Sequence, residues 1–219
     1  VDEYVSKNMS HMQPNTIKRN LNILRAIVND AYMRGFCDRI IKIKAPSVFD
    51  ERDEHLSETE VAALLGWAMR NLEPIEMACL ATAIYTGARV NELVAMRGDD
   101  FGEHGVVIRK RGGKTRDTRA IPYAASYQRL VFPHMLGASY GGGPVFSTVG
   151  ANAGHMSNAL GRILKEGCAA IGVTRNVRVH DLRHTFAYLC GCAGMDIGDL
   201  QVLLGHSSIA MTMRYRGFI

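Results

Sequence analysis

The chain has 219 residues, of which 47% are hydrophobic and 21% charged, with 22 glycines and 6 prolines. These values exclude a disordered, collagen-like or disulfide-stapled chain and indicate a globular protein. No apolar run is long enough to cross a bilayer, the first residues lack the features of a signal peptide, and 5 cysteines without a Cys-x-x-Cys pair fit a reducing cytoplasm.

The charge is distributed unevenly along the sequence. The formal net charge is +5, but residues 1–46 carry +4, residues 47–103 carry −8 and residues 104–219 carry +9. Two basic segments that flank an acidic one could form a positive groove for a polyanion, and nucleic acid is the usual candidate at a pI near 9.0. Many basic domains bind no DNA, so the motifs must decide between these classes.

The first predicted element is a basic amphipathic helix. After Pro14, apolar residues recur with a helical period until Gly35. The chain then shifts from basic to acidic without a clear period, which predicts a linker at residues 47–56 and a domain boundary near residue 50. The polar positions of the helix include candidates for DNA contacts: Lys18, Arg19 and Arg25.

The second segment opens with two further predicted helices. Ser57 and Glu60 form a capping box, because the Ser57 hydroxyl can accept from the Glu60 amide while the Glu60 carboxylate reaches back. This box starts a helix that runs to about residue 70. The next helix begins at Pro74, in a first-turn position that tolerates a missing N–H, and ends at Gly87.

A short helix at residues 89–96 precedes a change of period. Residues 106–108 and 119–122 flank a glycine-containing, cation-rich turn, which is typical of a small antiparallel hairpin. The predicted fold class is therefore mainly α with a small antiparallel β hairpin, an α+β arrangement.

Cys190 and Cys192 fall in an apolar helical stretch and are expected to be buried. Helical patterns cover residues 155–170, 180–193, 197–204 and 207–214.

Four short motifs follow one another in a specific order. They are Thr-Gly-Ala-Arg-Val-Asn-Glu-Leu at residues 86–93, Gly-Lys-Thr at 113–115, His-Asp-Leu-Arg-His at 180–184, and Leu-Gly-His at 204–206 with Tyr215 nine residues later. Each alone is weak evidence, but together they resemble the tyrosine recombinase, or phage integrase, family. The resemblance implies a catalytic domain at residues 57–219, preceded at residues 1–46 by part of a helical DNA-clamping core-binding domain.

Tyr215 is the nucleophile that the resemblance implies. A phenol with an ordinary pKa of about 10 must be activated by nearby cations or by a proton acceptor. Negative charge that builds on the phosphate oxygens must also be met by donors held in place beforehand. Arg89 and Arg183 are the expected clamp, because a guanidinium stays charged and offers a planar fork to phosphate. His180, three residues before Arg183, can reach the same phosphate.

The remaining candidates surround this clamp. Lys114, on the predicted hairpin, is the family-matched proton donor to the leaving 5′ oxygen, and His206 is expected to hydrogen-bond the scissile phosphate or the nucleophile region. Glu92 can orient Arg89 from three residues away or form only a local salt bridge. Further cations near the hairpin turn are candidates for phosphate contacts: Lys110, Arg111 and Arg116.

A rival interpretation makes His180 and His184 a pair of zinc ligands. The pattern lacks the glutamate of a His-Glu-x-x-His motif and an evident third ligand. We therefore expect no metal, and we expect His184 to be a packed structural residue.

The resemblance implies a site-specific DNA recombinase or integrase of a phage or mobile element. The tyrosine would form a 3′-phosphotyrosyl link and release a 5′ hydroxyl, and a second 5′ hydroxyl would then attack that link, so no metal, ATP or other cofactor is needed. The implied partners are double-stranded DNA with recombination sites and accessory DNA-bending proteins. On DNA the protein would form a homotetramer, and free in solution it would be a monomer. No membrane is implied. The alternatives are a type IB topoisomerase-like enzyme, a catalytically silent DNA-binding regulator and, more remotely, a metallohydrolase.

Overall fold

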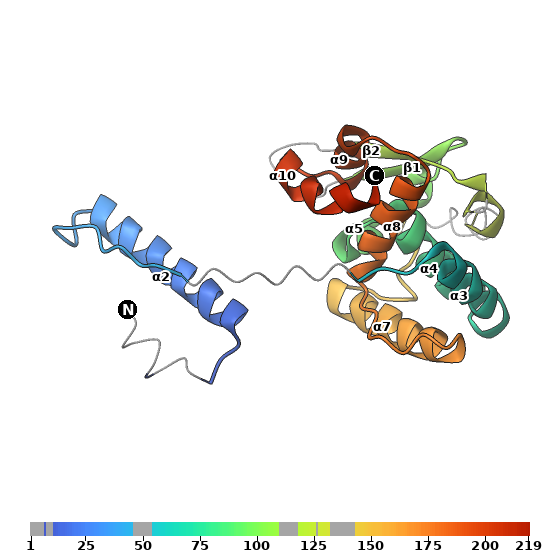
Figure 1. Ribbon diagram of the computed structural model, residues 1–219, viewed down its shortest axis with the longest axis horizontal. Coiled ribbons are helices and arrows are strands. Elements are labelled where there is room, and N and C mark those ends of the chain that lie inside the picture. Colours follow the sequence, from blue (N-terminus) through green and yellow to red (C-terminus); the bar gives the residue numbers. More distant parts are fainter. Residues whose placement is uncertain (1–6, 8–10, 46–53, 110–117, 126, 132–142) are drawn as a thin grey trace. The chain divides into compact units, whose positions relative to one another are not determined.

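Figure 1 shows a computed structural model of the chain, which describes residues 7, 11–45, 54–109, 118–125, 127–131 and 143–219. The chain divides into two compact units, Val1–Arg52 and Asp53–Ile219. The larger unit is mainly helical and contains a two-stranded antiparallel sheet. The elements in chain order are α2 (Pro14–Met33), α3 (Glu58–Asn71), α4 (Pro74–Thr86), α5 (Val90–Ala95), η1 (Gly98–Asp100), β1 (Gly105–Arg109), β2 (Thr118–Pro122), α7 (Ala153–Ala170), α8 (Asp181–Cys192), α9 (Ile197–Leu204), α10 (Ile209–Thr212) and η3 (Met213–Phe218).

The N-terminal unit is built around α2, as the helical period predicts. Pro14 occupies the first helical position, and the chain turns after the helix at Gly35, whose φ of 77° lies in the left-handed region. Arg25 donates to the carbonyl oxygen of Ile43 from Nε at 3.0 Å and from Nη2 at 2.6 Å. Because these donors bind the protein's own backbone, Arg25 is less available to a polyanion than the sequence alone indicates.

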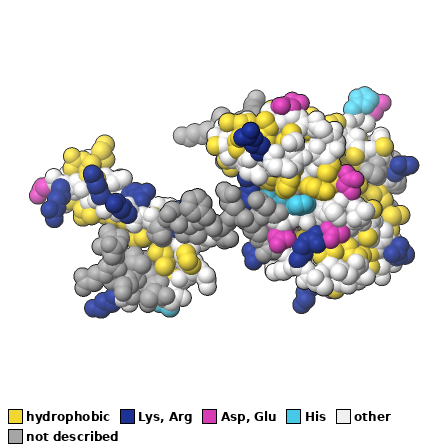
Figure 2. Space-filling model, viewed as in Figure 1, with side chains coloured by type: hydrophobic (Ala, Val, Ile, Leu, Met, Phe, Trp, Pro, Cys, Tyr) yellow, Lys and Arg dark blue, Asp and Glu magenta, His cyan; other side chains and the backbone are white. Residues whose placement is uncertain are grey.

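Basic and apolar side chains share the surface of this unit, as Figure 2 shows. Arg19 is exposed and Lys18 is half-buried. Ile23 and Ile27 are 51% and 60% exposed, so the apolar stripe of α2 is only partly covered by the described residues.

The core of the larger unit forms around α4. Residues 77–84 are all buried, which follows from a helix that is apolar on every face. α3, α5 and α8 contact it, while α7 packs on α3 and α5. The polar Thr82 is accommodated because its hydroxyl donates to the carbonyl oxygen of Ala78 at 2.7 Å.

The predicted capping box begins α3. The Glu60 amide donates to the Ser57 hydroxyl at 3.3 Å, and the Ser57 amide donates to Glu60 Oε2 at 2.8 Å. Arg175 also binds this carboxylate, from Nη1 at 2.7 Å and Nη2 at 2.5 Å, and these hydrogen bonds lower the pKa of Glu60 to about 2. Just before the box, the Leu56 amide donates to Thr185 Oγ1 of α8 at 3.0 Å and ties the start of the unit to its centre.

The hairpin places one face on the core. β1 and β2 pair antiparallel, and Val106 faces Ile121 across the sheet. Alternate residues of β2 are buried, so Arg119 lies on the same face as Ile121 and is only 7% exposed. A charged side chain thus points towards the interior beside apolar ones.

The C-terminal elements complete the unit. α9 contacts β2, and the two lie side by side in Figure 1. The predicted helix at residues 207–214 is divided here: α10 has only four residues, and a 3₁₀ helix, η3, follows it. Cys190 is buried as expected, but the prediction for Cys192 was wrong, because it lies exposed at the end of α8. Within the described ranges, no helix combines the length and apolar character needed to cross a bilayer.

Candidate active site

A tight turn between α4 and α5 forms the floor of the site. Gly87 ends α4 with a φ of 58°, and a Cβ there would lie 2.7 Å from the ring of Phe186. Only glycine fits both the left-handed backbone and this close approach. Thr86 stabilises the turn: its hydroxyl donates to the Thr82 carbonyl at 2.6 Å and accepts from the Ala88 amide at 3.2 Å. The turn places Arg89 at the start of α5.

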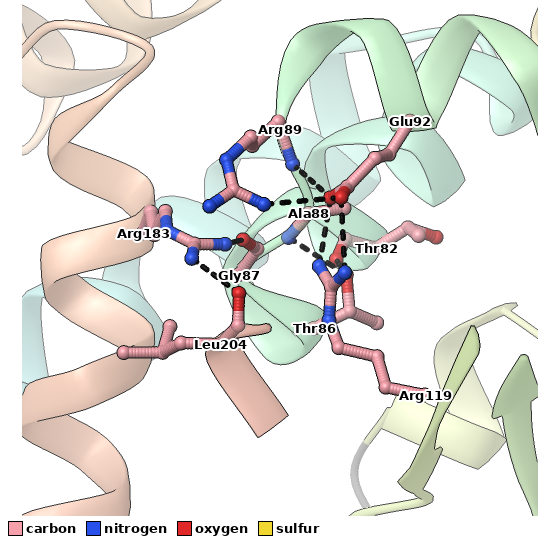
Figure 3. A network of polar contacts seen from close by, with 9 residues as sticks. All are labelled: Thr82, Thr86, Gly87, Ala88, Arg89, Glu92, Arg119, Arg183 and Leu204. Carbon is pink, nitrogen blue, oxygen red and sulfur yellow. Dashed lines mark hydrogen bonds and ion pairs between the residues drawn. The ribbon is translucent and has the colours of Figure 1, made fainter. Parts of the chain in front are cut away.

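Glu92 lies between two arginines, as Figure 3 shows. Its Oε2 accepts from the Arg89 amide at 2.7 Å, and its Oε1 lies 3.2 Å from Arg89 Nη1. On the other side, Arg119 donates to both oxygens, at 2.9 and 2.7 Å. The predicted proximity of Glu92 to Arg89 is therefore present, together with a partner that the sequence did not indicate.

The two arginines differ in exposure. The side chain of Arg89 is 41% exposed, whereas those of Arg119 and Glu92 are 7% and 9% exposed. Burial raises the pKa of Glu92, but the hydrogen bonds and charge of Arg119, with those of Arg89, outweigh it and hold the pKa below its ordinary value. The buried carboxylate therefore stays ionised and aligns Arg89, whose guanidinium still faces solvent.

Arg183 is almost wholly buried. Its guanidinium donates to the carbonyl oxygen of Gly87 from Nη1 at 2.7 Å and to that of Leu204 from Nη2 (Figure 3). Burial, then the charges of Arg89 and Arg119, lower the pKa of Arg183 to about 10. The residue remains a cation at neutral pH and joins the floor of the site to the end of α9.

Two histidines flank Arg183. His180 immediately precedes α8, and burial together with the charges of Arg183, Arg214 and Arg89 lowers its pKa. His206 follows Gly205, which ends α9 with a φ of 62°. Both imidazoles are therefore shifted towards the neutral form.

His206 has the larger shift. Burial, followed by the charges of several arginines, lowers its pKa to about 4. Its Nδ1 lies 2.9 Å from the hydroxyl of Thr212, a fully buried residue of α10. An imidazole that stays neutral at neutral pH can donate one hydrogen bond without adding to the charge of the site. The arginines that act on it are Arg183, Arg89, Arg119 and Arg214.

Tyr215 lies in η3 and is only 2% exposed. Its hydroxyl is 2.9 Å from Nδ1 of His184, and its ring is parallel to that of His206 with centroids 6.4 Å apart. It is also near enough to Arg183 to influence the pKa of that guanidinium. The expected nucleophile thus lies beside the cationic cluster.

His184 is buried, as predicted, but it also contacts Tyr215 rather than only packing in the core. The rings of His180 and His184 are perpendicular with centroids 5.2 Å apart. Among the described residues, no group of three His, Cys, Asp or Glu side chains is placed to hold a metal. The donor set therefore gives no support to the zinc interpretation.

The structure brings together most of the predicted site and adds to it. Three features of this cluster were not predicted from the sequence: Arg119, the contact of His184 with Tyr215, and Thr212. The alternation of Arg119 with Ile121 in a short strand is the signal that could have indicated an inward-facing charge. Lys110, Arg111, Lys114 and Arg116 lie outside the described residues. The predicted residues that gather are Arg89, Glu92, His180, Arg183, His206 and Tyr215.

Comparison with known proteins decides the family. Residues 54–217 match the model of the phage integrase family. The chain belongs to this family. A tyrosine recombinase of Pseudothermotoga lettingae is 24% identical over 220 residues, covering 98% of this chain and 76% of that protein. A putative integrase of Pseudomonas phage Pf1 is 29% identical over 220 residues, covering 97% of this chain and 60% of that protein.

Solved structures share the fold. The Tn1549 transposon integrase, in complex with transposon right end DNA, matches with a TM-score of 0.71 and 18% identity, over 97% of this chain and 77% of that one. The XerA recombinase matches with a TM-score of 0.64 and 23% identity, over 98% and 82%. The predicted family, fold class and enzyme class are confirmed. This integrase-family chain is a tyrosine-type site-specific recombinase, and a putative phage integrase is among its relatives. The topoisomerase-like and silent-regulator alternatives are not favoured.

Proposed function

We propose that Tyr215 is the nucleophile and that it attacks a DNA phosphate held by Arg89 and Arg183. The single observation that carries this proposal is the convergence of these side chains, far apart in the sequence, on one cationic cluster beside the Tyr215 ring. The product of the attack is a 3′-phosphotyrosyl link and a free 5′ hydroxyl. Attack by a 5′ hydroxyl on that link then exchanges one phosphodiester for another.

The two arginines have different tasks in this mechanism. Arg89 presents a partly exposed guanidinium, aligned by Glu92, that can bind non-bridging oxygens as they gain charge. Arg183 is fixed by two backbone carbonyls, so its remaining N–H donors and its buried positive charge are held in place for the phosphate. The protein therefore supplies a preorganised cationic site rather than one that assembles during the reaction.

The two histidines act as neutral groups in the proposal. His206, with a pKa near 4, donates a hydrogen bond to a phosphate oxygen or to the nucleophile region. His180, whose pKa is also lowered, can exchange a proton with the reacting hydroxyls. Lys114 remains the proposed donor to the leaving 5′ oxygen, on the sequence motif alone.

Double-stranded DNA with recombination sites is the proposed partner. The related Tn1549 integrase was solved on transposon DNA, and the basic segments of this chain fit a polyanion. We further propose a homotetramer on two sites, assembled from free monomers, with DNA-bending proteins as accessories. Binding through phosphate contacts should weaken steeply as salt rises.

Replacement of Tyr215 by phenylalanine tests the proposal. The DNA sequence at which the protein cleaves is first mapped in cellular DNA. A nicked duplex of that sequence is then mixed with the protein, and the products are resolved on a denaturing gel. Wild type should form a covalent protein–DNA complex, and Tyr215→Phe should form none while it binds the duplex normally. Tyr85→Phe, a half-buried tyrosine of α4, is the matched control and should retain trapping. A covalent complex with Tyr215→Phe would refute the assignment.

A further inference from the structure

One face of α8 holds the segment that carries Tyr215. His184, Tyr188 and Gly191 are four and then three residues apart, so they lie on the same helical face. Each contacts η3. His184 bonds the Tyr215 hydroxyl, the Tyr188 ring meets the Phe218 ring edge-on at 5.5 Å, and a Cβ on Gly191 would collide with the Phe218 backbone.

The contact between His184 and Tyr215 is shielded from water. His184 is 3% exposed and Tyr215 is 2% exposed, and the two polar atoms are 2.9 Å apart. A buried hydroxyl or ring nitrogen that loses its partner bears the full desolvation penalty. Rotation of the tyrosine away from His184 is therefore opposed, and the hydroxyl occupies a defined position.

His184 also relates that position to the phosphate clamp. It directly follows Arg183, whose guanidinium is fixed by the carbonyls of Gly87 and Leu204. One turn of α8 therefore sets the place of a clamping cation and the place of the hydroxyl. No mobile loop intervenes between the two.

We propose that His184 is a positioning residue that holds the hydroxyl of Tyr215 beside the arginine cluster for strand cleavage. This inference rests on the proposed function of Tyr215. Proton acceptance is a less suitable role for His184, because an imidazolium there would add a buried positive charge next to Arg183. A non-basic side chain that can still hydrogen-bond the Tyr215 hydroxyl should therefore preserve the function of His184.

Three variants test this role. His184→Asn keeps a polar atom near the place of Nδ1, His184→Phe keeps the ring without nitrogen, and His184→Leu is a second apolar replacement should the phenylalanine disturb folding. Without DNA, nitration of Tyr215 by tetranitromethane is followed by mass spectrometry of peptides. Tyr127, which is 1% exposed and whose hydroxyl is 3.0 Å from that of Thr82 in α4, is the internal folding control.

The expected results separate positioning from packing. Tyr215 should be protected in wild type and His184→Asn and should react about tenfold faster in the apolar variants, with Tyr127 protected throughout. On nicked recombination-site DNA, the apolar variants should form covalent complex about tenfold more slowly, and His184→Asn should stay within about threefold with an unchanged pH profile.

Several outcomes would overturn the inference. Protection of Tyr215 in a folded apolar variant would show that the contact does not hold the hydroxyl. Equal loss of cleavage in His184→Asn and His184→Phe would exclude positioning by hydrogen bonding. Failure of wild type to form any covalent complex would instead contradict the proposed function. The nitration rates would still test the contact between His184 and Tyr215, because they are measured without DNA.

Discussion

The carboxylate of Glu92 is bound by both Nη groups of Arg119, at 2.9 and 2.7 Å, within the interior of the larger unit. This fork-to-fork pair joins the hairpin to α5, 27 residues away in the sequence. Arg89 also binds this carboxylate, through its backbone amide at 2.7 Å and through a longer guanidinium contact of 3.2 Å. The pair therefore fixes Glu92 and leaves the guanidinium of Arg89 partly exposed to solvent.

Loss of Arg119 should destabilise the larger unit strongly. Among the described residues, Arg119→Met leaves Arg89 as the remaining ionic partner of a buried carboxylate, so the free energy of unfolding should fall by about 3 kcal/mol at neutral pH. Denaturant titration, monitored by circular dichroism, measures this change in the free energy of unfolding. Arg162→Met, which removes an arginine that is 53% exposed and paired with Glu76, should cost below about 1 kcal/mol. Similar losses in both variants would contradict the assigned importance of the buried pair.

The stability of the chain should decrease with acid in a window set by His206. Its pKa is about 4 in the folded chain and about 6.5 when unfolded, so between these values the unfolded state binds the proton and the folded state does not. Unfolding free energy should therefore fall as the pH decreases through this window. In His206→Gln, the free energy of unfolding should fall less steeply over the same pH range, as measured by denaturant titration. His104→Gln, at a side chain that is 90% exposed, controls for the removal of a histidine. An identical pH slope in wild type and His206→Gln would count against the shift.

Local signals in the sequence were sufficient for most helices. The Ser57 capping box, Pro74 at a helix start and Gly87 at a helix end each act within one turn of backbone, and the structure confirms all three. The segment after residue 207 was predicted less well. A single turn of α helix and a 3₁₀ helix differ too little in period for a short apolar pattern to separate them.

Sequence motifs account for several of the candidate side chains that the structure brings together. Arg89, His180 and Arg183 lie in compact motifs, and the structure gathers them as expected. The contacts of Arg119 with Glu92 and of His184 with Tyr215 were not predicted, because they depend on tertiary packing. The partner of His184 is 31 residues away in the sequence, and nothing in the local pattern identifies it.

Substitution of Gly191 should disturb the placement of Tyr215. A Cβ at Gly191 would collide with the Phe218 carbonyl, so Gly191→Ala should displace η3 from α8 and slow covalent complex formation by about tenfold. Gly161→Ala is the matched control, because Gly161 is also within a helix but has nothing within 4 Å of its added Cβ. That variant should gain about 0.5–1 kcal/mol of stability and cleave normally. Normal cleavage by Gly191→Ala would show that η3 tolerates displacement.

Thr212 should determine which nitrogen of His206 carries its proton. If the Thr212 hydroxyl donates to Nδ1, 2.9 Å away, the imidazole proton is on Nε2, where it can be donated to a phosphate oxygen. Thr212→Val keeps the shape of this fully buried side chain but removes the hydroxyl, so covalent complex formation should slow by about tenfold. Affinity for the DNA duplex should change by less than about twofold, since most of that affinity comes from phosphate contacts elsewhere. Thr212→Ser restores a hydroxyl and should recover most of the rate in the same gel assay. Equal rates in the valine and serine variants would mean that the tautomer of His206 is set by another group.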